Sequence, residues 1–143
     1  MLPLSQEVVR LDAEAKTAEE AIRLAGSLLV EAGKAEAGYV DAMVNGFREI
    51  GPYIVLAPGI AIPHARPEHG VKEQCLSLVR LKEPVVFGHP ANDPVRLVCA
   101  IGGVDNTGHI GMLQALASVL GDANKLQGIM EAATFSELQR AIQ

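Results

Sequence analysis

Two nearly continuous apolar runs in the middle of the chain constrain its fold more than any other feature. They read GIAIP at 59–63 and CLSLVRL at 75–81. A strand with one face in water alternates apolar and polar residues, whereas a strand covered on both faces is apolar at nearly every position. The two runs therefore predict strands inside a sheet that has helices on both sides.

Helical periodicity lies on both sides of these runs. Thr17 and Glu20 form a capping box, and apolar residues then recur at helical spacing until Gly33. A second amphipathic helix is predicted to end at Gly51. The remaining predicted helices cover 107–121, 123–133 and 135–142.

Three further strands complete the pattern and define the fold class. They are predicted at 7–11, 53–57 and 94–103, while GHPANDP at 88–94 has the composition of a loop. The order is strand, two helices, a block of strands and then helices, which predicts a layered α/β fold. With 143 residues, of which 49% are hydrophobic, the whole chain from 1 to 143 is expected to form a single domain.

Composition excludes several classes of partner. The net charge is −5, the pI is near 5.3 and no run of lysines or arginines occurs, which argues against nucleic acid or an anionic membrane as the main partner. No segment has the length of a membrane span or the pattern of a signal peptide, so a cytoplasmic protein is expected. Cys75 and Cys99 each lie in an apolar run, and we expect buried free thiols.

The segment APGIAIPHARPEHG places His64 between two prolines, Pro63 and Pro67. Proline favours extended backbone in the residue before it, so His64 and Arg66 are expected to point to the same side. A guanidinium beside an imidazole disfavours the imidazolium, and a neutral ring nitrogen can attack a phosphoryl group whose oxygens the guanidinium holds. The residues alone also allow the alternative of a hydrogen-bonded structural histidine.

His109 and Arg48 are two further candidates. His109 opens an apolar stripe in the first turn of a predicted helix, where free backbone N–H groups favour an anion. His64, His109 and this helix end could share one phosphate, or His109 could be a core histidine bonded to a backbone carbonyl. Arg48 lies near the end of the second helix, where a solvated charge is the simpler interpretation.

A zinc site is a lesser hypothesis. The chain has four histidines, His64, His69, His89 and His109, but no pair has the i, i+4 or C-x-x-C spacing that is typical of zinc ligands. His69 and His89 lie in polar, turn-rich segments and are expected to be exposed. No metal and no cofactor are therefore predicted.

The motif GIAIPHARPEHGV at 59–71 resembles the phosphorylation-site signature of fructose/mannitol-type enzyme IIA domains of the bacterial phosphoenolpyruvate-dependent sugar phosphotransferase system. The resemblance extends over nearly the whole chain. Within that superfamily, the segments at 51–73, 92–95 and 108–120 are most similar to the L-ascorbate-type branch. The resemblance implies a mixed β-sheet flanked by helices on both faces.

The resemblance also implies roles for the candidate residues. His64 matches the histidine that accepts a phosphoryl group from the phosphocarrier HPr and passes it to a cysteine of enzyme IIB, and His109 matches the second active-site histidine. Arg48 falls where mannitol-type members carry a site arginine, which ascorbate-type members need not have, and Arg66 belongs to the ascorbate-like form of the motif. The membrane permease, enzyme IIC, would be an indirect partner.

Two other functions stay open from the sequence. One is a regulatory module of the same fold, as in nitrogen-type paralogues, and the other is a metal-binding or interaction domain that is never phosphorylated. The sequence does not decide between a monomer and a homodimer. A carrier would need a shallow, partly apolar surface around His64, because its partners must bring their own reactive groups in line with the ring nitrogen.

Overall fold

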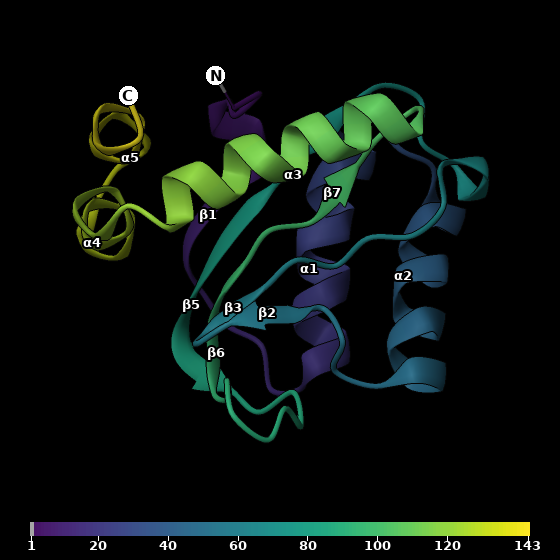
Figure 1. The fold of residues 1–143 in the computed structure, drawn as a ribbon, viewed down its shortest axis with the longest axis horizontal. Coiled ribbons are helices and arrows are strands. Elements are labelled where there is room, and N and C mark those ends of the chain that lie inside the picture. The colour runs from purple at the N-terminus through teal and green to yellow at the C-terminus, as the bar shows by residue number, and fades with distance from the viewer. Residues whose placement is uncertain (1) are drawn as a thin grey trace.

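A five-stranded sheet with strand order β1-β5-β6-β3-β2 forms the centre of the computed structural model, which describes residues 2–143 (Figure 1). Its strands are β1 (Val9–Ala13), β2 (Val55–Ala57), β3 (Ile60–Ala61), β5 (Leu78–Val85) and β6 (Val95–Val98). The β1–β5 and β3–β6 pairs are parallel, whereas β2–β3 and β5–β6 are antiparallel. The mixed sheet that the resemblance implies is confirmed.

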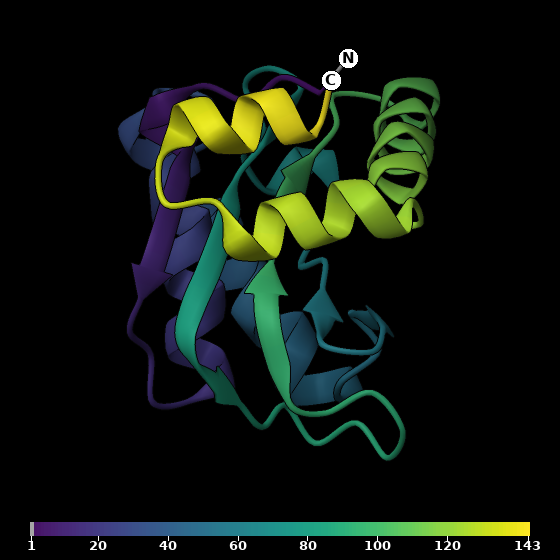
Figure 2. The same ribbon diagram turned by 90° about the vertical axis from the view of Figure 1, so that its left-hand side faces the viewer.

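Helices cover both faces of this sheet. On one face lie α1 (Ala18–Glu31) and α2 (Ala37–Ile50); the other elements are α3 (Asn106–Leu120), α4 (Ala123–Glu131) and α5 (Phe135–Ala141). Figure 2 shows α4 and α5 in front of the sheet and the two N-terminal helices behind it. Successive β5 residues contribute to opposite cores, Leu78 to the one under α3–α5 and Val79 to the one under α1 and α2. The apolar runs of the sequence arise from this double coverage.

The strands expected at 75–81 and 94–103 each form two strands instead of one. The first breaks at Ser77 into β4 (Cys75–Leu76) and β5, and the second breaks after Val98 into β6 and β7 (Ile101–Gly102). At the break, the backbone N–H of Ser77 donates to the carbonyl of Ala100, and the Ser77 hydroxyl donates to the carbonyl of Ala25 at 2.7 Å. The small antiparallel β4–β7 pair thus diverges from the main sheet.

The N-terminal strand differs from its prediction. A 3-10 helix, η1 (Gln6–Val8), precedes β1, which begins two residues later than expected and continues through Asp12 with a φ of 57°. The side chain of Asp12 accepts a hydrogen bond at 3.2 Å from Arg80, whose guanidinium is buried and also donates to the carbonyls of Ile129 at 2.9 Å and Ala132 at 2.7 Å. This arginine therefore ties β5 to the end of α4.

The helices start where the sequence predicts. The Thr17 hydroxyl accepts a hydrogen bond from the backbone N–H of Glu20 at 3.1 Å, and the carboxylate of Asp105 caps α3 by accepting from Gly108 at 2.6 Å. Such caps satisfy N–H groups that have no partner within the helix. The cap of α3 fixes where the helix begins, and so fixes the position of His109 one turn into it.

The β3–β6 pairing brings His64 to the end of the sheet. The parallel ladder continues past β3, with Cys99 N–H donating to Ala61 O at 2.9 Å and Ile101 N–H donating to Pro63 O at 3.1 Å. Beyond Pro63 the chain turns into a short 3-10 helix, η2 (Pro67–His69). His64 is therefore the first residue after the last backbone bond between this segment and β7.

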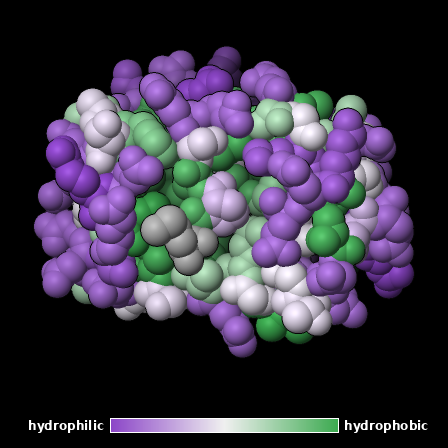
Figure 3. Space-filling view, turned by 90° about the horizontal axis from the view of Figure 1, so that it is seen from above, coloured by the Kyte–Doolittle hydropathy of each residue, from purple (hydrophilic) through white to green (hydrophobic). Residues whose placement is uncertain are grey.

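A hollow of about 400 Å³ lies between the N-terminal segment, α3 and α5, away from the end of the sheet that carries His64. Leu2, Leu4, Val119 and Phe135 are among its lining residues. Viewed from above, apolar surface gathers in the middle of the face that carries α3, and hydrophilic side chains surround it (Figure 3). Every helix within residues 2–143 falls short of the length and apolar character of a membrane span.

Candidate active site

A cavity of about 670 Å³ joins the exposed face of α2, the segment around His64 and the first turn of α3. Small residues of α2 leave room for it. The lining comprises Gly38, Asp41, Ala42, Asn45, Gly46, Glu49, Ile50, Tyr53, His64, Ala65, Arg66, Pro67, His69, Asn106 and His109. Three of the four candidate site residues, His64, His109 and Arg66, thus come from distant parts of the sequence to one cavity.

The imidazole of His64 is fixed by its own backbone segment. Its Nδ1 lies 2.8 Å from the carbonyl oxygen of Ile62. A carbonyl only accepts hydrogen bonds, so Nδ1 must carry the hydrogen, and in the neutral ring the lone pair is then on Nε2. The ring of Tyr53 also packs edge-on against it, with centroids 5.9 Å apart. In its neutral form His64 therefore presents one nucleophilic nitrogen, Nε2.

His109 lies beside this ring. The two imidazole centroids are 5.4 Å apart with a tilt of 51° between the planes. Burial lowers the pKa of His109 below its usual 6.5, and the charge of a protonated His64 lowers it further. His109 is therefore neutral at pH 7 and keeps one N–H to donate. Its position one turn into α3 places it with Asn106 at the positive end of the helix.

A glycine lets α3 approach the end of β7 closely. A Cβ atom on Gly103 would lie 2.7 Å from Cβ and 2.8 Å from Cα of His109. Carbon atoms pack at about 3.5–4.0 Å, so a side chain here would force the two segments apart. Gly103 thereby sets how near His109 lies to the His64 segment.

Arg66 supplies the cation of the cavity. Its backbone is extended, with φ −72° and ψ 144°, as the following proline predicts. Its side chain is exposed, and no carboxylate of residues 2–143 lies within the 4.0 Å of an ion pair. The guanidinium is therefore free to bind the oxygens of an incoming anion.

Comparison with known proteins identifies the family of the chain. The profile of the family described as "Phosphoenolpyruvate-dependent sugar phosphotransferase system, EIIA 2" matches residues 3–143. The chain belongs to this family. It is thus an EIIA chain, a phosphotransferase component of the sugar phosphotransferase system.

Two relatives that are 43% and 45% identical to the chain carry a more specific name than the family. The chain is 45% identical over 108 residues to the "Ascorbate-specific PTS system EIIA component" of Escherichia coli (strain K12), covering 74% of this chain and 70% of that protein. The protein of the same name from Salmonella choleraesuis (strain SC-B67) is 43% identical over 118 residues, with 81% and 77% covered. The EIIA chain also resembles a solved complex of enzyme IIAMtl and phosphorylated enzyme IIBMtl from Escherichia coli. That match has a TM-score of 0.86 at 30% identity and covers 99% of this chain and 98% of the solved one.

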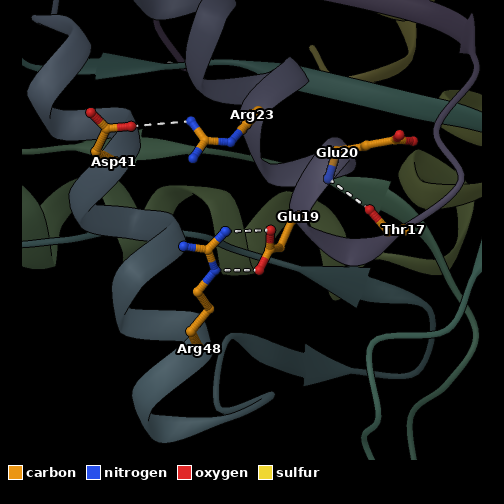
Figure 4. A network of polar contacts seen from close by, with 6 residues as sticks. All are labelled: Thr17, Glu19, Glu20, Arg23, Asp41 and Arg48. Carbon is orange, nitrogen blue, oxygen red and sulfur yellow. Dashed lines mark hydrogen bonds and ion pairs between the residues drawn. The ribbon is translucent and has the colours of Figure 1, made fainter.

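Arg48 lies outside the cavity lining of this EIIA chain. Its guanidinium donates hydrogen bonds to both carboxylate oxygens of Glu19 in the first turn of α1, with Nη2 2.8 Å from Oε2 (Figure 4). The pair raises the pKa of Arg48 and lowers that of Glu19 through the hydrogen bond between them. A second ion pair, Arg23 with Asp41 at 3.1 Å, links the same two helices. Arg48 thus joins α1 to α2, and its guanidinium already has a partner.

The other two histidines have different surroundings. His69 is exposed, as predicted, and contributes to the rim of the cavity. His89 is half-buried, so its predicted exposure is wrong: its Nδ1 accepts hydrogen bonds from the backbone N–H groups of Ala91 and Asn92, at 3.1 and 3.0 Å. Within residues 2–143, no three His, Cys, Asp or Glu side chains lie together as metal ligands would.

One residue of α2 that was not a candidate from the sequence contacts the backbone of the site. Tyr39 is fully buried, and its hydroxyl lies between the backbone of Ala65 and that of Ile101. A usable signal existed, since a buried tyrosine nearly always requires a partner for its hydroxyl. The identity of that partner depends on the fold and is not visible in the sequence.

Proposed function

We propose that this EIIA chain carries a phosphoryl group on Nε2 of His64, accepts it from phospho-HPr and passes it to a cysteine of an enzyme IIB. The observation that carries the proposal is the bond from His64 Nδ1 to the carbonyl of Ile62, because it leaves Nε2 as the nitrogen with a free lone pair. The reaction is a relay in which the small-molecule substrate is never bound by this chain.

In the accepting step, the lone pair of Nε2 forms a bond to phosphorus as the P–N bond of phospho-HPr breaks. The histidine of HPr leaves with the electron pair of that bond. The ring of His64 then holds the hydrogen on Nδ1 and gains positive charge, which the carbonyl of Ile62 stabilises by accepting the Nδ1–H bond. Arg66, the neutral His109 and the first turn of α3 line the same cavity as His64, and we propose that they bind the phosphoryl oxygens.

In the donating step, a cysteine thiolate of enzyme IIB attacks the same phosphorus and the electron pair returns to Nε2. Ground-state stabilisation must stay moderate, since a phosphoryl group held too tightly could not leave. One free guanidinium and one helix end, with no metal, suit this requirement. The sequence prediction of a metal-free carrier therefore stays our proposal.

The surface around the cavity suits transient protein partners. Large apolar side chains protrude near it, with Ile50 69%, Ile110 54% and Val104 49% exposed. Contiguous apolar patches on a protein surface commonly mark a contact surface. We propose that HPr and enzyme IIB use this rim in turn, at small interfaces that form and separate quickly.

We further propose that the system served by this chain takes up and phosphorylates L-ascorbate, through an enzyme IIB and a membrane permease, enzyme IIC. The support is the name shared by relatives at 43% and 45% identity. The relay would operate in the cytoplasm, where HPr is phosphorylated. Comparing transfer to the enzyme IIB of an ascorbate system with transfer to a mannitol-type one tests this specificity. Equal rates to both would contradict it.

The decisive experiment is incubation of the purified protein with phosphoenolpyruvate, enzyme I and HPr, followed by intact-mass measurement and an acid-lability test. We expect one acid-labile phosphoryl group that is absent from His64→Ala. The two arginines form a matched pair: Arg66→Ala should slow acceptance, while Arg48→Ala should not. Unaltered phosphorylation of His64→Ala would overturn the site, and no phosphorylation of the unsubstituted protein would overturn the function.

A further inference from the structure

The parallel ladder between the β3 segment and the β6–β7 segment opens at His64. Its bonds repeat at every second residue: Leu97 N–H to Gly59 O at 3.0 Å, Cys99 N–H to Ala61 O at 2.9 Å and Ile101 N–H to Pro63 O at 3.1 Å. In a regular parallel ladder the next bond would run from the N–H of Ala65 to the carbonyl of Ile101, with His64 between them. That direct bond is replaced by another contact.

The hydroxyl of Tyr39 occupies the place of the missing bond. It donates to the carbonyl of Ile101 at 2.6 Å and accepts from the N–H of Ala65 at 3.1 Å, and the Ala65 carbonyl lies 3.3 Å away. The two residues that flank His64 are thus both connected to Ile101. Pro63 accepts directly from the N–H of Ile101, and Ala65 is linked to the carbonyl of Ile101 through the hydroxyl of Tyr39. The hydroxyl is interposed where two strand segments would otherwise meet.

We propose that Tyr39 is a positioning residue of the phosphoryl-transfer site. Its interposed hydroxyl holds Ala65 away from β7 and so sets the direction in which His64 and Arg66 project into the cavity. This proposal rests on the function proposed above for His64. Tyr39 lies outside the cavity lining, so it acts through the backbone of the residue between the two site residues.

The first turn of α2 also fixes the far end of the same segment. The backbone N–H of Glu36 donates to the carbonyl of Gly70 at 2.8 Å. Gly70 has a φ of 133°, and a Cβ atom there would lie 3.1 Å from Cβ of Glu36. The segment 65–70 is therefore held at both ends by residues three positions apart, the N-cap Glu36 of α2 and Tyr39 in its first turn. The position of α2 thus determines the conformation of this segment.

The phenol is well suited to a permanent hydrogen bond. Burial raises the pKa of Tyr39 to about 12, so the hydroxyl stays protonated throughout the range in which proteins work. Its ring is fully buried in the core, which fixes the oxygen from behind. A side chain needed only to fill this volume would not require the oxygen atom.

Tyr39→Phe separates positioning from packing, because it keeps the ring and removes one oxygen. The N–H of Ala65 and the carbonyl of Ile101 must then close into a direct bond or remain unpaired, and in either case the segment loses the contact that fixes its position. A displacement near 1 Å costs up to about 100-fold in rate. We expect the kcat for phosphoryl transfer from phospho-HPr to fall about 10- to 100-fold. The KM for phospho-HPr should be unchanged, because the exposed rim is untouched.

Ser77→Ala is the matched control. It removes another fully buried hydroxyl that donates to a backbone carbonyl, that of Ala25 at 2.7 Å, in a part of the sheet outside the cavity lining. Both variants are compared by urea unfolding and by transfer kinetics. We expect Ser77→Ala to lose stability with no change in kcat. Wild-type kcat in Tyr39→Phe, or an equal fall in kcat in Ser77→Ala, would overturn the positioning role.

Hydrogen exchange of the unsubstituted protein tests the same point even if Tyr39→Phe does not fold. The amide of Ala65 should exchange much more slowly than that of its neighbour Arg66, because the phenol protects it. Rapid exchange at Ala65 would overturn the proposal. Failure of the unsubstituted protein to accept phosphate is a distinct result that would refute the function itself, and the positioning role with it.

Discussion

Gly103→Ala adds one methyl group where the chain leaves β7 and faces the first turn of α3. The new carbon would lie 2.7 Å from Cβ, 2.8 Å from Cα and 3.0 Å from N of His109. Carbon atoms pack at no less than about 3.5 Å, so the two segments must separate by roughly 0.8 Å. Two of the three crowded atoms belong to the backbone, and no rotamer change relieves them. The first turn of α3 must therefore move and take His109 with it.

Two magnitudes follow from this displacement. Overpacking costs about 1–3 kcal/mol, while removing a glycine returns up to ~1 kcal/mol through the unfolded state, so we expect the free energy of unfolding to fall by about 1–2 kcal/mol. Moving His109 by most of an ångström should slow phosphoryl acceptance by roughly 10- to 100-fold. Urea unfolding and the rate of transfer from phospho-HPr measure the two effects.

Gly111→Ala is the control for this experiment, because it makes the same chemical change within α3. A Cβ atom on Gly111 meets nothing within 4 Å. Alanine is the better helix former, so this variant should gain about 0.5–1 kcal/mol and transfer phosphate at the normal rate. If Gly103→Ala matched the unsubstituted protein in stability and rate, the close approach of α3 would have no role in placing His109.

Three further outcomes are expected. Cys75 and Cys99 should react with a thiol reagent at pH 8 only on unfolding, because burial raises their pKa to about 11 and about 12; rapid labelling of the native protein would contradict this. Since the pKa of His109 is lowered in the folded state, the unfolded chain binds more protons than the folded one below pH 6.5, and the free energy of unfolding should decrease on acidification. Urea unfolding at several pH values measures this decrease, which should be smaller in His109→Asn. Arg80→Ala should lower the free energy of unfolding by about 2–5 kcal/mol, because two carbonyls at the end of α4 lose their donor. Thermal melts measure this loss, and unchanged stability would show that Arg80 does not stabilise the contact between β5 and α4.

Elements with strong local signals could be predicted from the sequence. The capping residue Thr17 and the apolar stripes locate the helices, and the continuous apolar runs correctly indicate a sheet covered on both faces. The prolines around His64 correctly predict an extended Arg66 on the side of the same cavity. In each case the cause acts within a few residues along the chain.

Features that depend on distant contacts could not be predicted. The break at Ser77 is stabilised by a carbonyl of α1, 52 residues away, and the left-handed conformation of Asp12 accompanies a bond to Arg80, 68 residues away. The sequence also gives no sign that Glu19 binds Arg48, although it correctly places that arginine near the end of a helix. Local patterns specify elements, and partners become visible only once the elements are packed.

The proposed choice of Nε2 as the reactive nitrogen of His64 rests on a hydrogen bond to a main-chain carbonyl, that of Ile62. No substitution of the side chain at that position deletes the acceptor, so the choice of nitrogen is insensitive to most mutations nearby. The apolar rim is different, because Ile50, Val104 and Ile110 are exposed side chains that can change without touching the bond. Partner choice can therefore diverge among descendants of one gene while the chemistry is inherited unaltered.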